Sequence, residues 1–223
     1  MKDKFKILFI SASSKSGGGP SHIFTLKNLL EKEFNLFYAI PRINHYQKNI
    51  NSENHLIIKE RMISITDICR IIKFSQKHSI DLIHAHGKGA VIIARLVKLF
   101  IRKPLVYTPH GIHIKFLNKF IRSFYLFYEK IFGILDDYKI FVSKSEFNYA
   151  LSLNIFANKD FVIINNSVKD KPIKTTIQNQ LLINKKIGIT NNHKNIISIS
   201  RLVDQKNIFE IFDIAKVLNM YNF

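Results

Sequence analysis

The stretch that decides the fold runs Lys6-Ile-Leu-Phe-Ile-Ser-Ala-Ser-Ser-Lys-Ser-Gly-Gly-Gly-Pro-Ser-His-Ile23. Its apolar run, Ile7 to Ile10, predicts a buried parallel strand, and three glycines, Gly17 to Gly19, follow after a few small residues. Pro20 suits the first turn of a helix, and the residues after it supply an apolar helical face. A strand, a glycine-rich turn and a helix N-terminus offer backbone N–H groups and a helix dipole to an anion.

The glycine turn does not match the standard nucleotide motifs. It lacks the G-x-G-x-x-G spacing of a dinucleotide site, and no G-K-[ST] follows it as a P-loop requires. A tight turn in any α/β protein explains these residues as well as a phosphate site does. Both interpretations stay open on this stretch alone.

Composition narrows the class of protein. The 223 residues, 47% of them apolar, suffice for one large α/β domain or for one domain and part of another. The single cysteine, Cys69, excludes an internal disulfide, suits a reducing compartment and lies in an apolar helical pattern that predicts a core position. No apolar run approaches the roughly 18 residues of a membrane-spanning helix, and the N-terminus lacks a signal-peptide pattern. We therefore expect a cytoplasmic protein, with the inner membrane face as one location.

The charge is strongly basic, with 34 Lys and Arg against 16 Asp and Glu for a net +18. Such a field attracts nucleic acid, anionic lipid or phosphorylated ligands. Lys, Ile and Asn are abundant together along the whole chain, so a base-composition bias in the gene is a competing cause. A nucleic-acid binder is the weaker interpretation because no RNP-like aromatic motif, zinc spacing or basic-region helix is present.

Strands and helices are predicted to alternate. After the first helix, strands are expected at residues 35–40, 80–86, 104–108, 138–142 and 161–164, with helical patterns between most of them. This alternation predicts an α/β fold with a doubly wound parallel sheet. Ligands of such sheets bind beyond the carboxyl ends of the strands, where the glycine turn and several polar residues are expected to meet.

Histidines are prominent at these strand ends. His84, His86, His110 and His113 suggest a metal, but no carboxylate or cysteine is spaced with them and their pairs do not define zinc geometry. We therefore expect no metal. His110, between Pro109 and Gly111 on a loop after a strand, is expected to contact a ligand or transfer a proton, with a structural role as the alternative.

The C-terminal third has its own organisation. Residues 169–180 are polar and lysine-rich, and Asn195 to Ser200 resembles a new first strand before a helix. Arg201 and Lys206 lie on the loop between them, where they can bind a second anion. The expected domains are 1–168, a linker with a short helix at 169–190, and at 191–223 the start of another domain, because a strand and one helix cannot bury a sheet face.

Six motifs in order resemble family 4 glycosyltransferases of the GT-B fold: SGGGP, DLIHAHG, TPHGIH, IFVSKSE, IINNSV and ISISRLVDQKN. The likeness covers about residues 5 to 218. It implies two Rossmann-like domains facing a cleft and a retaining sugar transfer from a nucleotide sugar, without cofactor or metal, to a glycan or lipid-linked acceptor of a cell-surface polysaccharide or glycolipid.

The resemblance also implies roles for individual residues. Gly18 and Gly19 would meet the donor phosphates, His110 would lie by the reacting sugar and acceptor, and Arg201 and Lys206 would grip the diphosphate. Four further residues are expected to line the acceptor side of the cleft: His86, His113, Ser143 and Asn166.

The sequence departs from the family pattern in three places. Ser200 and Asn207 replace glycines beside Arg201 and Lys206, and Asn166-Ser167-Val168 stands where Asn-Gly-Val is usual. The family's pair of glutamates, which hold the donor sugar and ribose, would lie beyond residue 223. We therefore expect a truncated or split enzyme with little activity alone; the alternative is a non-catalytic, acceptor- and membrane-binding half that needs a second polypeptide.

The helical run from residue 114 to 135 has an apolar stripe, with basic residues opposite and Glu129 as its one acid. A core helix with a solvated face explains the stripe. The basic face, on which Leu126 and Tyr125 are expected to be exposed, also suits anionic lipid headgroups, so peripheral membrane contact stays open. The stripe comprises Leu117, Phe120, Ile121, Phe124, Phe127, Tyr128, Ile131 and Leu135.

Overall fold

The computed structural model describes residues 4–13, 18–42, 50–112, 114, 117–155, 160–167, 182, 185–186 and 207–220. The chain forms two compact units, residues 1–167 and 168–223. In the second unit, helix α7 (Ile208–Met220) is described where the sequence predicts a helix. The expected linker and the strand before α7 lie almost wholly outside the described residues, as do Arg201 and Lys206.

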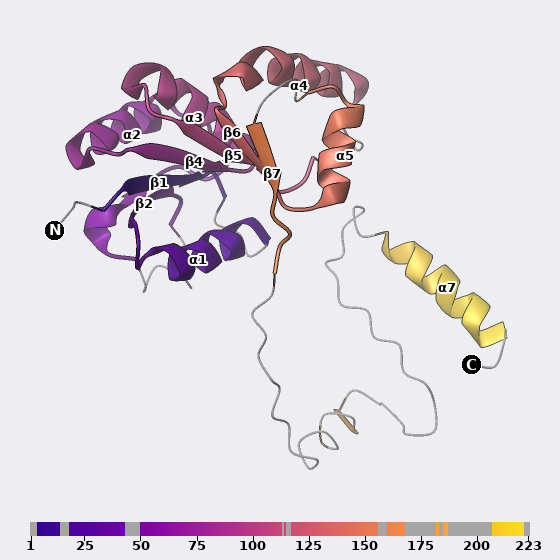
Figure 1. The fold of residues 1–223 in the computed structure, drawn as a ribbon. Helices are drawn as coiled ribbons and strands as arrows, with labels where there is room; N and C mark the ends of the chain where they lie inside the picture. The colour runs from indigo at the N-terminus through magenta and orange to yellow at the C-terminus, as the bar shows by residue number, and fades with distance from the viewer. Residues whose placement is uncertain are drawn as a thin grey trace. The chain divides into compact units, whose positions relative to one another are not determined.

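The first unit is built on a seven-stranded parallel sheet with the order β3-β2-β1-β4-β5-β6-β7 (Figure 1). This order confirms the predicted doubly wound sheet: the chain winds outward from β1 to one edge, then returns to β4 beside β1 and winds to the other. The strands are β1 (Lys6–Ser11), β2 (Asn35–Ile40), β3 (His55–Ile57), β4 (Leu82–His86), β5 (Leu105–Thr108), β6 (Tyr138–Phe141) and β7 (Asp160–Ile163).

Helices cover both faces of this sheet. In Figure 1, α1 lies on one side of the central strands, and α2 and α3 lie on the other. Because successive residues of a strand point to opposite faces, Leu8 and Ile10 enter the core under α2 and α3, while Ile7 and Phe9 enter the core with α1. The helices are α1 (Gly18–Leu30), α2 (Ile65–His78), α3 (Lys88–Ile101), α4 (Lys119–Phe132) and α5 (Lys144–Ser152).

A buried ion network joins α3 to α4 and to the segment before β6. The Arg95 guanidinium donates two hydrogen bonds to Glu129, at 3.2 and 2.8 Å, and two to Asp136, at 2.9 and 2.8 Å. Lys139 Nζ lies 3.1 Å from Asp136, so the network holds two cations and two anions. Burial alone would lower the pKa of Arg95, but these two carboxylates outweigh it and raise the pKa.

Helix α4 presents its apolar stripe to the outside, so the prediction of a core helix is wrong. The side chains of Phe120, Phe124 and Phe127 are 89%, 70% and 62% exposed. The opposite face is inward because Glu129 is held by Arg95, and half-buried Tyr125 and Leu126 pack against a small core. Among the described residues, no helix has the length and apolarity to cross a membrane.

Cys69 is a second correction. It is exposed on α2, whereas the sequence predicts a core position. The buried positions of this helix are Asp67, Ile68, Ile71 and Ser75, a helical spacing that leaves residue 69 on the flank. Asp67 belongs to the inward face because its carboxylate accepts the Lys59 N–H at 2.9 Å.

A candidate active site at the carboxyl edge of the sheet

Three strands end side by side where the sheet order reverses. In the sheet register Ser11 of β1 pairs with His86 of β4, and His86 pairs with Thr108 of β5. Helices α1 and α3 begin a few residues beyond β1 and β4. This edge is the switch point at which open α/β sheets bind ligands, as the sequence predicts.

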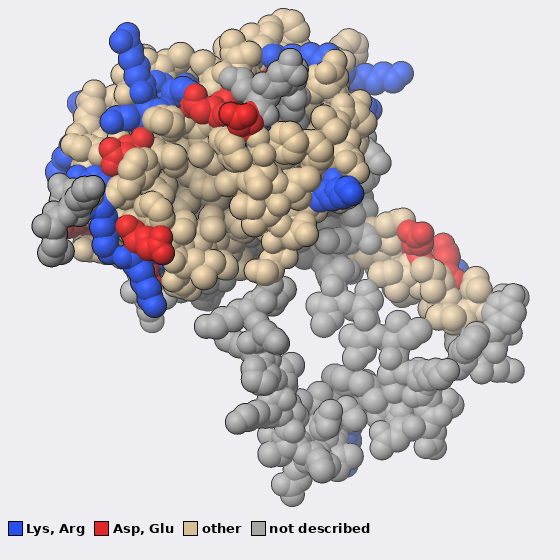
Figure 2. Space-filling model, in the orientation of Figure 1, with Lys and Arg blue, Asp and Glu red and all other residues tan. Residues whose placement is uncertain are grey.

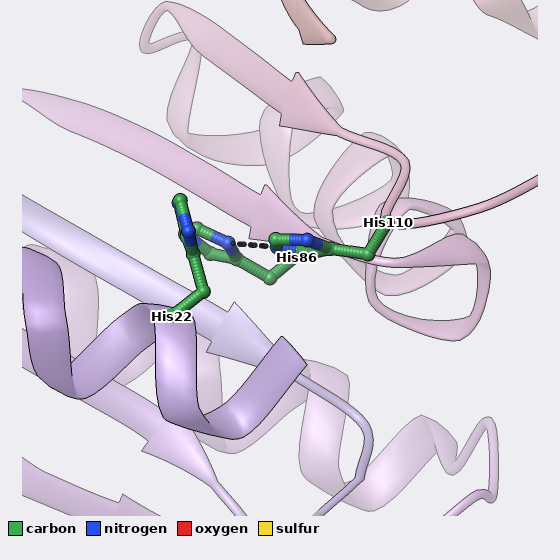
Figure 3. A group of neighbouring side chains, drawn as sticks. All are labelled: His22, His86 and His110. Atoms are coloured by element: carbon green, nitrogen blue, oxygen red, sulfur yellow. Dashed lines mark hydrogen bonds between the residues drawn. The ribbon is translucent and has the colours of Figure 1, made fainter. Parts of the chain in front are cut away.

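Three histidines from three elements meet at this edge (Figure 3). His86 Nδ1 lies 2.9 Å from His110 Nε2, and the two rings are nearly parallel. The ring of His22, from α1, has its centroid 4.8 Å from that of His110 and 5.8 Å from that of His86. The sequence pattern singles out His86 and His110 but misses His22, whose available signal is its place in the first turns of the helix after the glycines.

His110 occupies an unusual backbone conformation. Its φ is +56°, and Gly111 follows at +104°. A positive φ is uncommon for a residue with a Cβ and costs of order 1–3 kcal/mol, so the surrounding structure must hold it. Pro109 is buried immediately before His110, and the Gly111 N–H donates a hydrogen bond to the Glu146 carboxylate.

Glu146 connects this loop to α5. Its other carboxylate oxygen accepts the Val142 N–H at 3.1 Å, so one buried side chain holds the His110 loop and the end of β6 together. Its own N–H donates to Ser143 Oγ at 3.1 Å. Ser143, expected to line the cleft, thus has its hydroxyl engaged as the N-cap of α5.

The glycine turn reaches the same place. Gly18 and Gly19 are the first residues of α1, and a Cβ added to Gly19 would lie 4.0 Å from His110 Cδ2. The structure therefore brings the predicted anion-binding helix end beside the predicted catalytic histidine. Gly17 lies outside the described residues.

Asn166, after β7, also belongs to this cluster. Its backbone N–H donates to the Val142 carbonyl at 3.2 Å, and its side chain raises the pKa of His22 against the larger, opposite effect of burial. His113, Arg201 and Lys206 fall outside the described residues, so their predicted places in the site remain predictions.

Burial keeps the histidines of this edge neutral. It lowers the pKa of His110 from 6.5 to about 4, with the neighbouring His22 as a second cause. Burial, followed by the charges of His110 and His22, lowers the pKa of His84 to about 3. The pKa of His86 lies well below its ordinary range and that of His22 is also lowered, chiefly by burial in each case. At neutral pH these imidazoles act through lone pairs and N–H groups.

The two inner histidines differ in their partners. His84 Nε2 lies 2.9 Å from Thr108 Oγ1, a structural pair inside the sheet. His86 uses Nδ1 for His110, while its buried Nε2 has no hydrogen-bond partner among the described residues. An unpaired buried nitrogen is costly, and such groups concentrate at functional sites.

The sheet order and this edge define the class of protein: a Rossmann-like domain of the GT-B type. Among solved structures, a glycosyltransferase from Rickettsia africae matches with a TM-score of 0.68 and 18% identity, over 90% of this chain and 54% of that one. HepE of Anabaena, crystallised with UDP and glucose, matches with a TM-score of 0.65 and 16% identity, over 82% and 50%. At these identities the likeness shows the fold alone.

Sequence comparison identifies the family. The model of Glycosyltransferase Family 4 matches residues 16–171, most of the chain, so the chain belongs to this family. Two Escherichia coli proteins, the O-antigen biosynthesis glycosyltransferase WbnH and the probable O-antigen biosynthesis glycosyltransferase WbiN, are each 25% identical over 169 residues, 74% of this chain and 49% of theirs. The chain spans about half the length of the curated relatives it matches.

Proposed function

We propose that this chain takes part in transferring a sugar from a nucleotide-sugar donor to a glycan or lipid-linked acceptor during cell-surface polysaccharide or glycolipid synthesis, with retention of anomeric configuration. Family membership and the names of the two Escherichia coli relatives support the reaction class. HepE was crystallised with UDP-glucose, which supports a nucleotide-sugar donor.

The observation that carries this proposal is the placement of His110. Its ring stands at the switch-point edge, on a positive-φ loop held by Glu146, beside the first residues of α1. A neutral imidazole in this position can accept or donate a hydrogen bond to a sugar hydroxyl near the reacting carbon. The backbone at Gly18 and Gly19 can approach a donor phosphate without a Cβ in the way.

Charge on the leaving diphosphate needs cations. We assign this role to Arg201 and Lys206, following the family motif that they match. A forked guanidinium and an ammonium would stabilise the charge that develops as the glycosidic bond breaks, and this step requires no metal.

The test is a transfer assay on the protein isolated from its native host, with radiolabelled nucleotide sugars and a lipid extract as acceptor. We expect labelled lipid or glycan with at least one donor, and a loss of at least about 10²-fold in the rate for His110→Ala, the cost of removing one transition-state hydrogen bond. His78→Asn, on α2, is the matched histidine control and should keep the rate. No transfer from any donor, or equal rates for His110→Ala and the control, would reject the proposal.

We also propose that the outer face of α4 contacts an anionic membrane. Exposed Phe120, Phe124 and Phe127 form an apolar surface, and exposed Lys119, Arg122 and Lys130 accompany it on the same helix. Basic side chains stand along the top of the first unit, where Figure 1 places α4 (Figure 2). This combination suits an interface where rings enter the headgroup region and cations meet lipid phosphates.

Vesicle sedimentation tests this contact. Binding to phosphatidylglycerol vesicles should fall roughly 10²-fold when Lys119, Arg122 and Lys130 are changed to Glu, at about 1 kcal/mol for each basic residue lost. The control changes exposed Lys32, Lys73 and Lys77 to Glu, which alters the net charge equally. Undiminished binding of the α4 variant, or an equal loss in the control, would reject the membrane contact.

A further inference from the structure

We propose that His22, His86 and His110 form a binding site for one divalent transition-metal ion of the zinc class. Each histidine offers one ring nitrogen, and these three nitrogens lie within 4.8 Å of one another. They come from α1, from the end of β4 and from the loop after β5, so three separate elements converge on one point (Figure 3).

The distances are close to those of a metal centre. Zinc binds imidazole nitrogen at 2.0–2.1 Å in tetrahedral sites, which separates two ligand nitrogens by about 3.3 Å. His86 Nδ1 and His110 Nε2 are 2.9 Å apart and form a hydrogen bond, in which either nitrogen can carry the proton. An ion between them would take the place of that proton after a shift of a few tenths of an ångström. His22 is half-buried near the start of α1, and its ligand nitrogen lies within 4.8 Å of the other two.

The surroundings hold the ligands in place. His86 is buried at the end of β4, and His110 is held by the bond between Gly111 N–H and Glu146. His84 is engaged by Thr108 and is therefore not a ligand.

The three rings are withdrawn from solvent to different degrees: His86 is buried, and His22 and His110 are half-buried. The Glu146 carboxylate accepts a hydrogen bond from the Gly111 N–H and so adds a negative charge close to His110.

The donor set decides which ions fit. Three imidazoles without a thiolate suit Zn²⁺, Co²⁺, Ni²⁺ or Cu²⁺ and leave one coordination position for water or an anion, whereas Mg²⁺ prefers oxygen ligands. Binding does not depend on the proposed transfer reaction. If the chain takes part in that reaction, the ion binds the His110 nitrogen that would otherwise hydrogen-bond to the substrate. The ion then acts as an inhibitor rather than as a cofactor.

The test uses the metal-free 223-residue chain, titrated with Zn²⁺ by calorimetry and with Co²⁺ by visible absorption. We expect one site per chain, a tetrahedral Co²⁺ band, and no binding of Mg²⁺. His22→Asn and His110→Asn should each weaken Zn²⁺ binding at least about tenfold. Asparagine tolerates the positive φ of residue 110, so that variant keeps its loop. His78→Asn and His84→Gln are the matched controls and should bind as the wild type does.

Absence of saturable Zn²⁺ binding at tens of micromolar would overturn the proposal. So would unchanged affinity in both ligand variants with their circular dichroism intact, or Mg²⁺ binding as tight as Zn²⁺.

Discussion

Arg95 shows how one residue settles the orientation of a helix. It is a cation buried on α3, and Glu129 and Asp136 each grip it with two hydrogen bonds. Removing one partner from such a pair leaves a charge without compensation in the interior, which costs far more than losing an exposed pair. The residue therefore explains why α4 turns the face carrying Glu129 inward.

Glu129→Ala should lower the free energy of unfolding by about 3–5 kcal/mol, measured by urea titration. Glu31→Ala is the control because it breaks the Lys27–Glu31 pair at 2.6 Å on the surface of α1, which should cost less than about 0.5 kcal/mol. Equal losses in the two variants would contradict the network's role.

The buried His84 should make the free energy of unfolding depend on pH. Its folded pKa is about 3 against an ordinary 6.5, so between these values the unfolded chain binds the proton and the folded chain does not. Stability is therefore complete above about pH 7 and falls with acid, by about 1.4 kcal/mol per pH unit for each such histidine. His110, His22 and His86 face His84 and act in the same direction.

The comparison is urea unfolding at pH 7.5 and 5.0 in a chelating buffer. His84→Gln keeps a side chain able to reach Thr108 but cannot titrate, so its loss between the two pH values should be smaller than that of the wild type. An identical or steeper pH dependence in the variant would show that His84 titrates normally in the folded chain.

Residue patterns alone indicate part of this site. The sequence Pro-His-Gly after an apolar run places His110 on a loop at a strand end, and the glycines mark the start of α1. His22 is different: its role depends on a 4.8 Å approach to a ring 88 positions away in the chain, which sequence spacing does not encode. Glu146 likewise needs the fold, since its contact with Gly111 spans 35 residues.

At the scale of elements, the outward face of α4 has a direct consequence for stability. Phe120 is 89% exposed, whereas Phe141 on β6 is 1% exposed. Phe120→Ala should change the free energy of unfolding by no more than about 0.5 kcal/mol. Phe141→Ala, the same chemical change in a core, should cost about 3–5 kcal/mol. A large loss at Phe120 would mean that this face is covered in the folded protein.

The tie between the His110 loop and α5 is a second element-scale feature. Glu146→Gln keeps the shape but removes the charge that accepts the Gly111 and Val142 N–H groups. We expect a loss of about 1–2 kcal/mol in unfolding free energy and a changed imidazole resonance of His110. The control is Glu33→Gln, which changes an exposed glutamate. If the His110 resonance is unchanged in both variants, Glu146 does not hold the His110 loop.

The hydrophobic pattern predicts where the strands and helices lie better than it predicts which parts of the protein they pack against. Apolar runs give the strands well because a buried parallel strand is apolar on both faces. The stripe of α4 is also real, but periodicity says only that one face is apolar and not which face meets the protein. Two charged residues indicate the correct orientation: Arg95 inside the apolar pattern of α3 and Glu129 on α4. Buried charges are stable only when paired, and these two residues pair with each other.

At the scale of the molecule, residues 1–167 carry a seven-stranded doubly wound sheet, with His22, His86 and His110 together at its carboxyl edge. The net charge of +18 favours the anionic partners of the proposed function, namely a nucleotide diphosphate and a lipid surface. Both proposals use the first unit, one through its switch-point edge and the other through α4.

Substrate binding at the carboxyl edge of the sheet is tested most directly by nuclear magnetic resonance of the isotope-labelled 223-residue chain, titrated with UDP-glucose and with candidate acceptor glycans in chelating buffer. We expect the shifts to concentrate at the carboxyl edge, at Gly19, His22 and His110. Lys103 and Asp137, at the amino ends of β5 and β6, should stay unchanged. Shifts confined to the amino edge, or no shift at His110 with any of these ligands, would contradict substrate binding at the carboxyl edge.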